Sequence, residues 1–179
     1  ASPIRKLSPL SDAAKARGVK VYQLNIGQPD LPTPQVALDA IRNIDRTTLE
    51  YSPSDGYRFY RENLVKYYRK FDINLAPDEI IVTAGRSEAV LYAFMACLNP
   101  GDEIIVSEPA YANYMAFAVS AGAVIKTIPS SIEDGFRLPE IEEFEKLINP
   151  KTKGVLICNP NNPTGYVYTA DEMEQIRQL

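Results

Sequence analysis

A short loop, Thr83-Ala84-Gly85-Arg86-Ser87-Glu88-Ala89, combines residue types that could bind a phosphate. It follows a β-branched run and precedes a long apolar stretch, so one glycine turns a predicted strand into a predicted helix. Free amides at the start of that helix, with the Ser87 hydroxyl, suit an anion. The loop has neither a GxxxxGK[ST] nor a GxGxxG pattern. Taken alone, it is more typical of an ordinary strand-to-helix turn with Ser87 as the helix cap.

A second candidate is Cys158-Asn159-Pro160-Asn161-Asn162-Pro163-Thr164-Gly165, which follows a predicted apolar strand. Ligands of open α/β sheets bind just beyond the carboxyl ends of parallel strands. Two prolines flank two asparagines and restrict the backbone, so that a side-chain amide can be directed at a ligand. The same pattern also fits a rigid turn without a ligand. Tyr111 follows another predicted strand and could stack on a flat ring or simply pack.

Histidine is absent from the chain, and there are two cysteines, Cys97 and Cys158. Within these residues this excludes a Ser-His-Asp triad, a Cys-His pair and an HExxH zinc site. Two thiols in apolar surroundings form neither a disulfide framework nor a zinc cluster, so we expect small buried thiols and no metal. Chemistry here must use other residues, a cofactor, or sequence outside the chain.

The elements that must position these loops change character midway along the chain. The first half is loosely organised and rich in turns; its longest predicted helix, at about 56–71, has Tyr60, Leu64, Tyr67 and Phe71 on an apolar stripe and Arg61 off it. The second half alternates strands and helices, and its strands are apolar on both faces. That pattern predicts a parallel sheet covered by helices, an α/β fold.

The expected elements are as follows. Helices are predicted at about 8–16 (with Ser8 and Pro9 at its start), 34–44 (capped by Thr33), 56–71, 87–98, 111–121 and around 141–147, and strands at 21–26, 80–83, 103–107, 123–128 and 154–158. Asn99–Asp102 is predicted to form a type II turn.

The net charge and the two ends of the sequence bear on partners, location and completeness. The net charge of −4 gives no reason to expect nucleic acid or an anionic membrane as partner. No apolar run approaches the ~20 residues of a membrane span, and the first residues lack a signal-peptide core, so we expect a soluble, cytoplasmic protein. Thr169 and Glu172 form a capping box for a helix without a stop signal, which suggests that the chain is a fragment.

Five segments, in order, resemble the fold-type I pyridoxal-phosphate (PLP) aminotransferases, the aspartate aminotransferase superfamily. CNPNNPTG resembles the NPxNPTG signature, and LNIGQPDLPTP resembles the family's L-x-x-G-x-P-D-x-x-T-P segment. Tyr51-x4-Gly56-x4-Arg61 resembles its Y-x4-G-x4-R stretch. The loop at Thr83–Ala89 and the segment PGDEIIVSEPAYANY match its cofactor loop and its P-x-[YW]-x-x-Y segment. Together the matches cover nearly the whole chain.

The resemblance implies a role for each matching position. Gly85, Arg86 and Ser87 would bind the PLP phosphate, mostly through backbone amides, and Tyr111 would stack on the pyridine ring. Asn162 would donate to the ring's phenolic oxygen and lie near the substrate. Gly27 would lie against the substrate α-carboxylate. Tyr51 would reach the phosphate in the neighbouring subunit, so a homodimer with shared active sites is implied.

Three residues that the family needs have no counterpart here: the Schiff-base lysine, the aspartate paired with the pyridine nitrogen and the arginine that clamps the substrate carboxylate. In the family all three follow the NPxNPTG segment. Lys151 and Lys153 precede the last predicted strand without a matching context. Lys126 and Lys146 are interpreted as solvated charges. No catalytic residue is therefore assigned in this chain, which is expected to be inactive alone.

The resemblance implies a three-layer α/β/α PLP-binding large domain, incomplete here. Residues 1–45 would form an N-terminal arm and the start of the small domain, and residues 46–179 the first part of the large domain. The implied function is PLP-dependent transfer of an amino group from an amino acid, with aspartate a candidate, to a 2-oxo acid in amino-acid metabolism and biosynthesis. A PLP-dependent C–S lyase or related synthase, or a non-catalytic module, are the alternatives.

Overall fold

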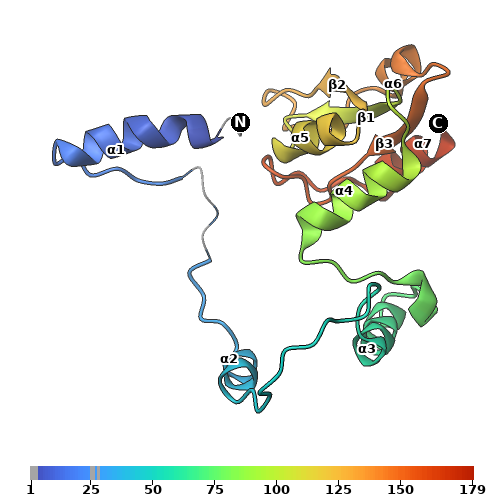
Figure 1. Cartoon of the computed structure of the whole chain (residues 1–179). Helices are drawn as coiled ribbons and strands as arrows, with labels where there is room; N and C mark the ends of the chain where they lie inside the picture. The colour runs from blue at the N-terminus through green and yellow to red at the C-terminus, as the bar shows by residue number, and fades with distance from the viewer. Residues whose placement is uncertain (1–3, 25–26, 28) are drawn as a thin grey trace. The chain divides into compact units, whose positions relative to one another are not determined.

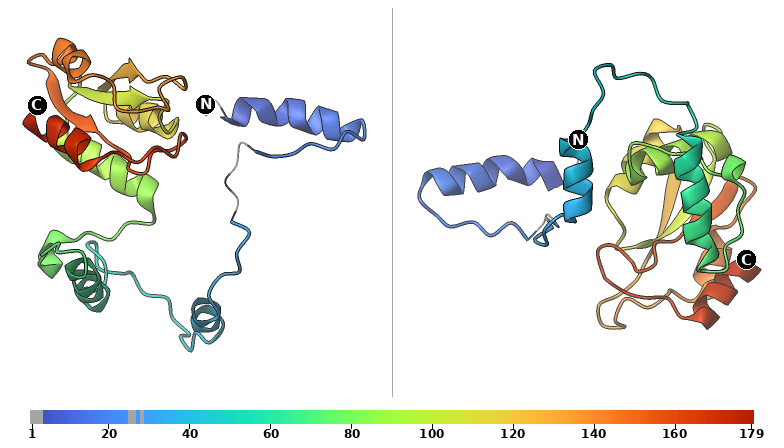
Figure 2. Two further views of the ribbon diagram at one scale, coloured as in Figure 1. Left: turned by 180° about the vertical axis from the view of Figure 1, so that it is seen from behind. Right: turned by 90° about the horizontal axis from the view of Figure 1, so that it is seen from below.

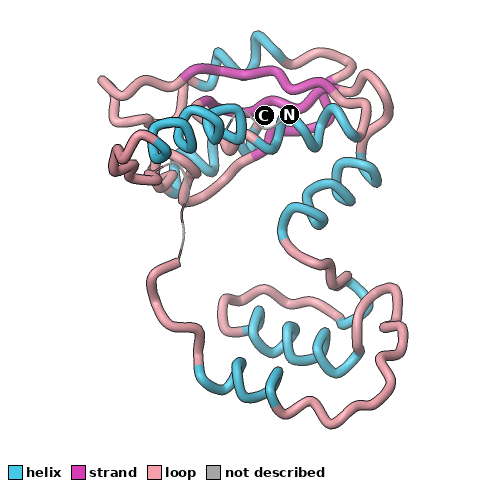
Figure 3. Tube along the Cα trace, turned by 60° about the vertical axis from the view of Figure 1, so that its left-hand side comes forward, coloured by secondary structure: helices cyan, strands magenta, loops and turns pink. Residues whose placement is uncertain are grey.

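The computed structural model describes residues 4–24, 27 and 29–179. They form two compact units: the first unit ends at Thr83, and the second unit comprises Ala84–Leu179. Figure 1 labels the helices and strands along the chain. Figure 3 shows that the strands, in magenta, belong to the second unit, whereas the described part of the first unit consists of helices and loops.

The described residues of the first unit form three helices and two short 3-10 helices. These are η1 (Ile4–Leu7), α1 (Ser8–Ala16), α2 (Gln35–Arg42), α3 (Arg58–Arg69) and η2 (Pro77–Glu79). The predicted helices are confirmed, but two caps differ. Leu7 rather than Ser8 is the N-cap of α1, because η1 runs directly into it with helical backbone angles. Pro34 rather than Thr33 is the N-cap of α2, one residue later than predicted.

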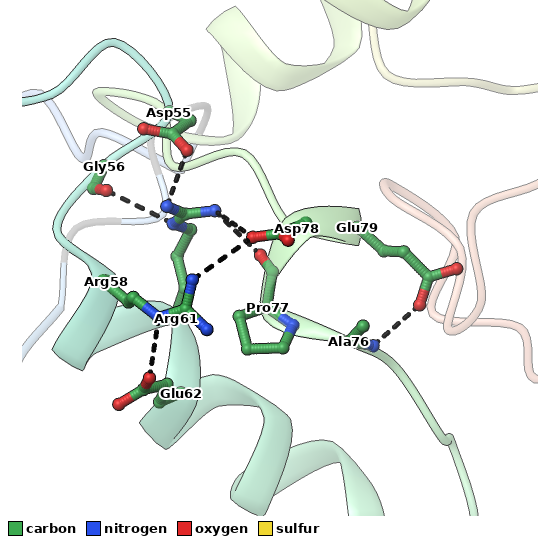
Figure 4. A network of polar contacts seen from close by, with 9 residues as sticks. All are labelled: Asp55, Gly56, Arg58, Arg61, Glu62, Ala76, Pro77, Asp78 and Glu79. Carbon is green, nitrogen blue, oxygen red and sulfur yellow. Dashed lines mark hydrogen bonds and ion pairs between the residues drawn. The ribbon is translucent and has the colours of Figure 1, made fainter.

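Arg61 is the buried centre of a polar network in the first unit, shown in Figure 4. Its Nη2 lies 2.6 Å from Asp55 Oδ2, its Nε donates to the Gly56 carbonyl at 3.2 Å, and its Nη1 donates to the Pro77 carbonyl at 2.9 Å. Asp78 is 3.6 Å from Nη1. The guanidinium therefore ties α3 to the loop before it and to η2, and its burial is compensated by these partners.

The predicted apolar stripe of α3 is wrong. Tyr60, Tyr67 and Phe71 are exposed, whereas Arg61 and Val65 are the buried residues of this helix. A guanidinium can replace an apolar side chain on the inner face when carbonyls and carboxylates satisfy its donors.

Neither of the two predicted strands of the first half is found among the residues that the structure describes. Residues 21–24 are irregular, and residues 25 and 26 lie outside the described ones. Residues 80–83 follow η2 outside any helix or strand, and the Val82 amide donates to the Asp55 carbonyl at 3.1 Å. A β-strand requires a neighbouring strand along its length, whereas the Val82 amide is bonded to a residue in a loop.

The second unit is a parallel sheet with helices on both faces. Its strands are β1 (Glu103–Glu108), β2 (Val124–Pro129) and β3 (Thr152–Leu156), in the order β2-β1-β3, and both neighbours run parallel to β1. Its helices are α4 (Arg86–Cys97), α5 (Asn113–Ser120), α6 (Ile141–Leu147) and α7 (Ala170–Gln178). Figure 2 shows these helices around the sheet from two further directions. The predicted α/β class is confirmed, with β3 two residues earlier than expected.

Alternate residues of β1 face two separate cores. Ile104 and Val106 pack with Phe94 of α4, with Leu98 just after that helix, and with Ala118 of α5. Ile105, which is fully buried, packs on the other face with Ile128, Leu138 and Phe144, and Ile176 of α7 joins this cluster. Because successive strand residues point to opposite faces, one continuous apolar strand fills both cores and produces three layers.

Turns and caps in the second unit follow the local chemistry. Gly101 has φ +89°, and the Asp102 amide donates to the Asn99 carbonyl at 3.0 Å, as a type II turn requires. Thr169 Oγ1 accepts from the Glu172 amide at 3.2 Å, and the Glu172 carboxylate accepts from the Thr169 amide at 2.7 Å. The predicted turn and capping box are both confirmed.

Candidate functional site

The start of α4 presents backbone amides beside an arginine. Gly85 is the N-cap, and the first amides bonded inside the helix are those of Glu88 and Ala89, which donate to the Gly85 carbonyl. The amides of Arg86 and Ser87 precede that first bond and belong to the positive end of the helix dipole. Ser87 is therefore not the cap, as the simpler interpretation of this loop required; it lies in the first turn, exposed.

The Glu88 side chain is hydrogen-bonded to the residue before this helix start and to the next turn of the helix. Its Oε2 accepts from the Ala84 amide at 2.6 Å, and its Oε1 accepts from the Tyr92 hydroxyl at 3.0 Å. The Ala84 hydrogen bond, and then the one from Tyr92, lower the pKa of Glu88 below its ordinary value. The carboxylate is thus occupied by the chain that precedes the helix, which leaves the neighbouring amides of Arg86 and Ser87 for an anion.

Tyr111, between β1 and α5, is held by side chains from two segments. The Arg86 guanidinium lies over its ring, 5.1 Å from the centroid, and Asn113 Nδ2 donates to its hydroxyl oxygen at 2.7 Å. The Tyr114 ring meets it edge-on, with centroids 5.4 Å apart. Tyr111 therefore lies beside the start of α4, and its ring orientation is fixed by a cation–π contact and a hydrogen bond.

The loop after β3 is joined to the loop after β1 by Asn161. Its Nδ2 donates to the Pro109 carbonyl at 3.0 Å and to Thr164 Oγ1 at 2.9 Å. Its amide donates to the Tyr166 carbonyl, and its carbonyl accepts from the Gly165 amide, both at 2.8 Å. Asn162, the asparagine singled out from the sequence, has an exposed side chain beside this junction. The Pro109, Pro160 and Pro163 peptide bonds are cis.

Tyr114 and Cys158 add a buried polar contact under these loops. Burial, and then the hydrogen bond with the Cys158 thiol, raise the pKa of Tyr114 to about 12, while the charge of Arg86 acts in the opposite direction. Cys158 Sγ also lies 3.3 Å from the Pro160 carbonyl. Buried thiols were expected at both cysteines, but Cys158 is only partly buried, and Cys97, at the end of α4, is exposed.

The structure brings five of the predicted residues into one unit and leaves two in the other. Gly85, Arg86, Ser87, Tyr111 and Asn162 belong to the second unit, on loops that the Arg86–Tyr111 and Asn161–Pro109 contacts connect. Gly27 and Tyr51 belong to the first unit and are exposed, Tyr51 completely.

The sequence reasoning missed Asn161, Asn113 and Glu88. Each is a polar residue within two positions of a residue that was assigned a role, and that adjacency was the available signal.

The lysines differ in part from the sequence interpretation. Lys126 is half-buried and lies 3.6 Å from Glu103, a buried carboxylate that also accepts from Asn149, so it is an ion-pair partner rather than a solvated charge. Lys146 is exposed and pairs with Glu143. Lys153 lies inside β3, not before it, and Lys151 is exposed just ahead of that strand.

These groups suit a flat, anionic ligand. Backbone amides and a guanidinium at a helix start match a phosphate, a tyrosine ring in a fixed orientation matches an aromatic ring, and an exposed carboxamide supplies a donor for a ring oxygen. A phosphorylated aromatic cofactor therefore fits the donor set at this edge of the sheet. Among the described residues, no helix is long and apolar enough to cross a bilayer.

Comparison with known proteins agrees with this geometry. The model of the family described as aminotransferase class I and II matches residues 19–179. Aspartate aminotransferase from Thermotoga maritima is 37% identical over 182 residues, which cover 99% of this chain and 48% of that protein. Aspartate/prephenate aminotransferase from Thermus thermophilus is 35% identical over 92% of this chain and 43% of that protein. Alanine aminotransferase from Pyrococcus furiosus superimposes with a TM-score of 0.91 at 32% identity, covering 99% of this chain and 46% of that structure.

The chain belongs to the class I and II aminotransferases, a family of PLP-dependent enzymes. The resemblance seen in the sequence is thereby confirmed, as is the three-layer α/β architecture. The chain spans about half the length of the curated relatives it matches.

Proposed function

We propose that the complete protein is a PLP-dependent aminotransferase that transfers an amino group from an amino acid to a 2-oxo acid. The observation that carries this proposal is the convergence of three loops in the second unit. The start of α4 meets Tyr111 through Arg86, and the loop after β1 meets the loop after β3 through Asn161. Ligands of α/β sheets bind at such strand ends.

The cofactor's phosphate is assigned to the start of α4. The amides of Arg86 and Ser87 and the turn at Gly85 would hold the phosphate oxygens, and the Arg86 guanidinium would add a positive charge near them. Tyr111 would face the pyridine ring, and the Asn162 carboxamide would donate to the ring's phenolic oxygen and border the substrate. When bound, PLP supplies an electron-accepting ring that stabilises charge on the amino acid's α-carbon.

Residues of the first unit are assigned to the substrate and to a second subunit. Gly27 would lie against the substrate's α-carboxylate, since a glycine lets a ligand approach the backbone closely. Tyr51, whose side chain is fully exposed, would reach the phosphate bound by a partner subunit in a homodimer. Residues 1–45 are proposed as the arm and the start of the small domain, and residues 46–179 as the first part of the large domain.

The Schiff-base lysine is proposed to lie outside these 179 residues. Lys126, the lysine in β2, forms an ion pair with the buried Glu103, Lys151 directly precedes β3, and Lys153 lies inside β3 rather than in the loop after it. The chain by itself is therefore not expected to transaminate. A cytoplasmic location and a biosynthetic role remain predictions from the sequence.

Aspartate is the first candidate among amino donors. Two of the relatives named above carry aspartate in their names, and a structural neighbour is an alanine aminotransferase. A lyase or a synthase is not favoured, because the similar proteins named here are aminotransferases.

The test is a visible absorption spectrum of the complete protein titrated with PLP, followed by addition of single amino acids. We expect an absorption band of protein-bound PLP that is converted to the pyridoxamine phosphate spectrum by the donor amino acid and restored by a 2-oxo acid. Chromatography of the products identifies the new amino acid. A band that amino acids do not convert, or release of pyruvate and thiol from a cysteine conjugate without amino transfer, would contradict the proposal and support the lyase.

A further inference from the structure

We infer that Asn161 is a positioning residue that holds the two ring-contacting loops in register. Asn161 has the position that varies within the NPxNPTG pattern, and nothing in the family resemblance assigns it a role. The inference rests on the proposed function, because it concerns where Tyr111 and Asn162 lie relative to a bound ring.

The hydrogen bonds of Asn161 link segments that are far apart in sequence. Its Nδ2 group donates one proton to the Pro109 carbonyl, 52 residues away, and the other to Thr164 Oγ1 in its own loop. Pro109 is two residues before Tyr111, and Asn161 is directly before Asn162. One carboxamide therefore fixes the spacing between the two groups that would contact the cofactor ring.

The rest of the loop is folded around the same residue. The Asn161 amide and carbonyl bond to Tyr166 and Gly165, and Thr164 Oγ1 also accepts from the Tyr166 amide at 3.2 Å. Asn161 is partly buried, whereas Asn162 is exposed. The two asparagines thus differ in kind: the first makes internal bonds that shape the loop, and the second leaves its amide directed outward.

The chemistry of the amide explains why this position needs a donor. A peptide carbonyl and a threonine hydroxyl oxygen both accept, so the bridging group must offer two N–H bonds from one atom. Aspartate has the same shape and no such donor, and its negative charge would repel the Pro109 carbonyl. Asn161→Asp is therefore the sharpest variant, and Asn161→Ala is the neutral one that removes the bridge without adding charge.

Hydrogen–deuterium exchange of the complete protein without PLP tests the link itself. We expect N161D and N161A to exchange faster at the Gly165 amide, within the loop after β3, and also at the Tyr114 amide, which donates to the Tyr111 carbonyl. Thr164→Val keeps the bond to Pro109, so it should speed exchange at Tyr166 and leave Tyr114 protected. Asn162→Ala, the matched control, should leave both segments as in the wild type.

PLP titration of the same variants tests the consequence for ligand binding. We expect N161D and N161A to bind PLP about tenfold more weakly while their PLP-free thermal unfolding midpoints stay close to the wild-type value. Unchanged exchange at Tyr114, or unchanged PLP affinity despite faster exchange, would overturn the inference. A wild-type protein that takes up no PLP would overturn the proposed function instead, and the exchange result would still decide whether Asn161 joins the loops.

Discussion

Tyr111 illustrates how neighbouring side chains can orient a residue before a ligand binds. Its ring is covered on one side by Arg86, and its hydroxyl accepts from Asn113. Each contact is modest by itself, since a cation–π pair at an exposed site contributes about 0.5–1 kcal/mol. Together they restrict the ring to one orientation before any cofactor arrives, so less freedom is lost when a flat ligand binds.

Arg86→Ala removes the contact with the Tyr111 ring and the charge near the proposed phosphate site. We expect PLP affinity of the complete protein to fall about three- to tenfold, because the backbone amides remain in place. Absorbance titration measures the affinity. Arg177→Ala is the matched control: Arg177 is an exposed arginine of α7 that pairs with Glu174, and its loss should leave PLP affinity unchanged. Equal effects of the two variants would count against Arg86.

Tyr114 makes the free energy of unfolding depend on pH in the alkaline range. Its pKa is raised from 10.0 to about 12 by burial and by the Cys158 thiol. Between these values the unfolded chain loses the phenol proton and the folded chain keeps it, so the free energy of unfolding falls as the pH rises.

In Tyr114→Phe this contribution disappears. The stability difference between wild type and Tyr114→Phe should be constant below pH 10 and shrink between pH 10 and 12. Urea unfolding of the complete protein at a series of pH values measures it, and a difference that does not change with pH would refute the assignment.

The elements show two ways of building a helix start. Helix α7 uses a side-chain capping box from Thr169 and Glu172, whereas α4 begins at Gly85 without a side-chain cap bond. In α4 the carboxylate of Glu88 bonds to the Ala84 amide, just outside the helix. The physical difference is which amides stay available: a capped start satisfies them internally, and the start of α4 offers them to an anion.

Gly56 lies in close contact with Val82 in the first unit. It has φ +92°, and a Cβ atom added to it would lie 2.6 Å from both Cβ and Cγ2 of Val82. We expect Gly56→Ala to destabilise the protein by about 2–4 kcal/mol through backbone strain and overlap combined.

Gly18 provides the control, since its φ is +79° and, apart from its chain neighbours, none of the described atoms lies within 4 Å of an added Cβ. Gly18→Ala should therefore cost about 1 kcal/mol from backbone strain alone. Thermal unfolding of both variants checks the comparison, and an equal loss in the two would show that the Val82 contact does not matter.

At the scale of the whole molecule, the stability gained on ligand binding should depend on both the phosphate and the ring of the ligand. Any ligand that binds the folded protein raises its stability, by about 2.7 kcal/mol at one hundred times its dissociation constant. We expect PLP to raise the unfolding temperature of the complete protein, and pyridoxal, which has no phosphate, to raise it much less at the same concentration. Differential scanning fluorimetry measures both shifts. Equal shifts would mean that the start of α4 does not bind the phosphate.

The sequence by itself determined the α/β class, the strands and helices of the second unit, the Asn99–Asp102 turn and the α7 capping box. These follow from local signals: apolar periodicity, a Pro-Gly pair at a turn and a T-x-x-E pattern act within a few residues of each other. It also indicated the loops of the proposed site, because ordered motifs marked the segments at Thr83–Ala89 and Cys158–Gly165.

Only the tertiary structure decided which polar residues are buried with hydrogen-bond partners and which side chains connect distant loops. Arg61 was placed off the apolar stripe because its charge is visible in the sequence, whereas the carbonyls of Gly56 and Pro77 that satisfy it are not. The sequence of residues 80–83 is typical of a strand, yet a strand forms only where another strand pairs with it. Asn161 and Pro109 are 52 residues apart, and only folding brings a donor to that carbonyl.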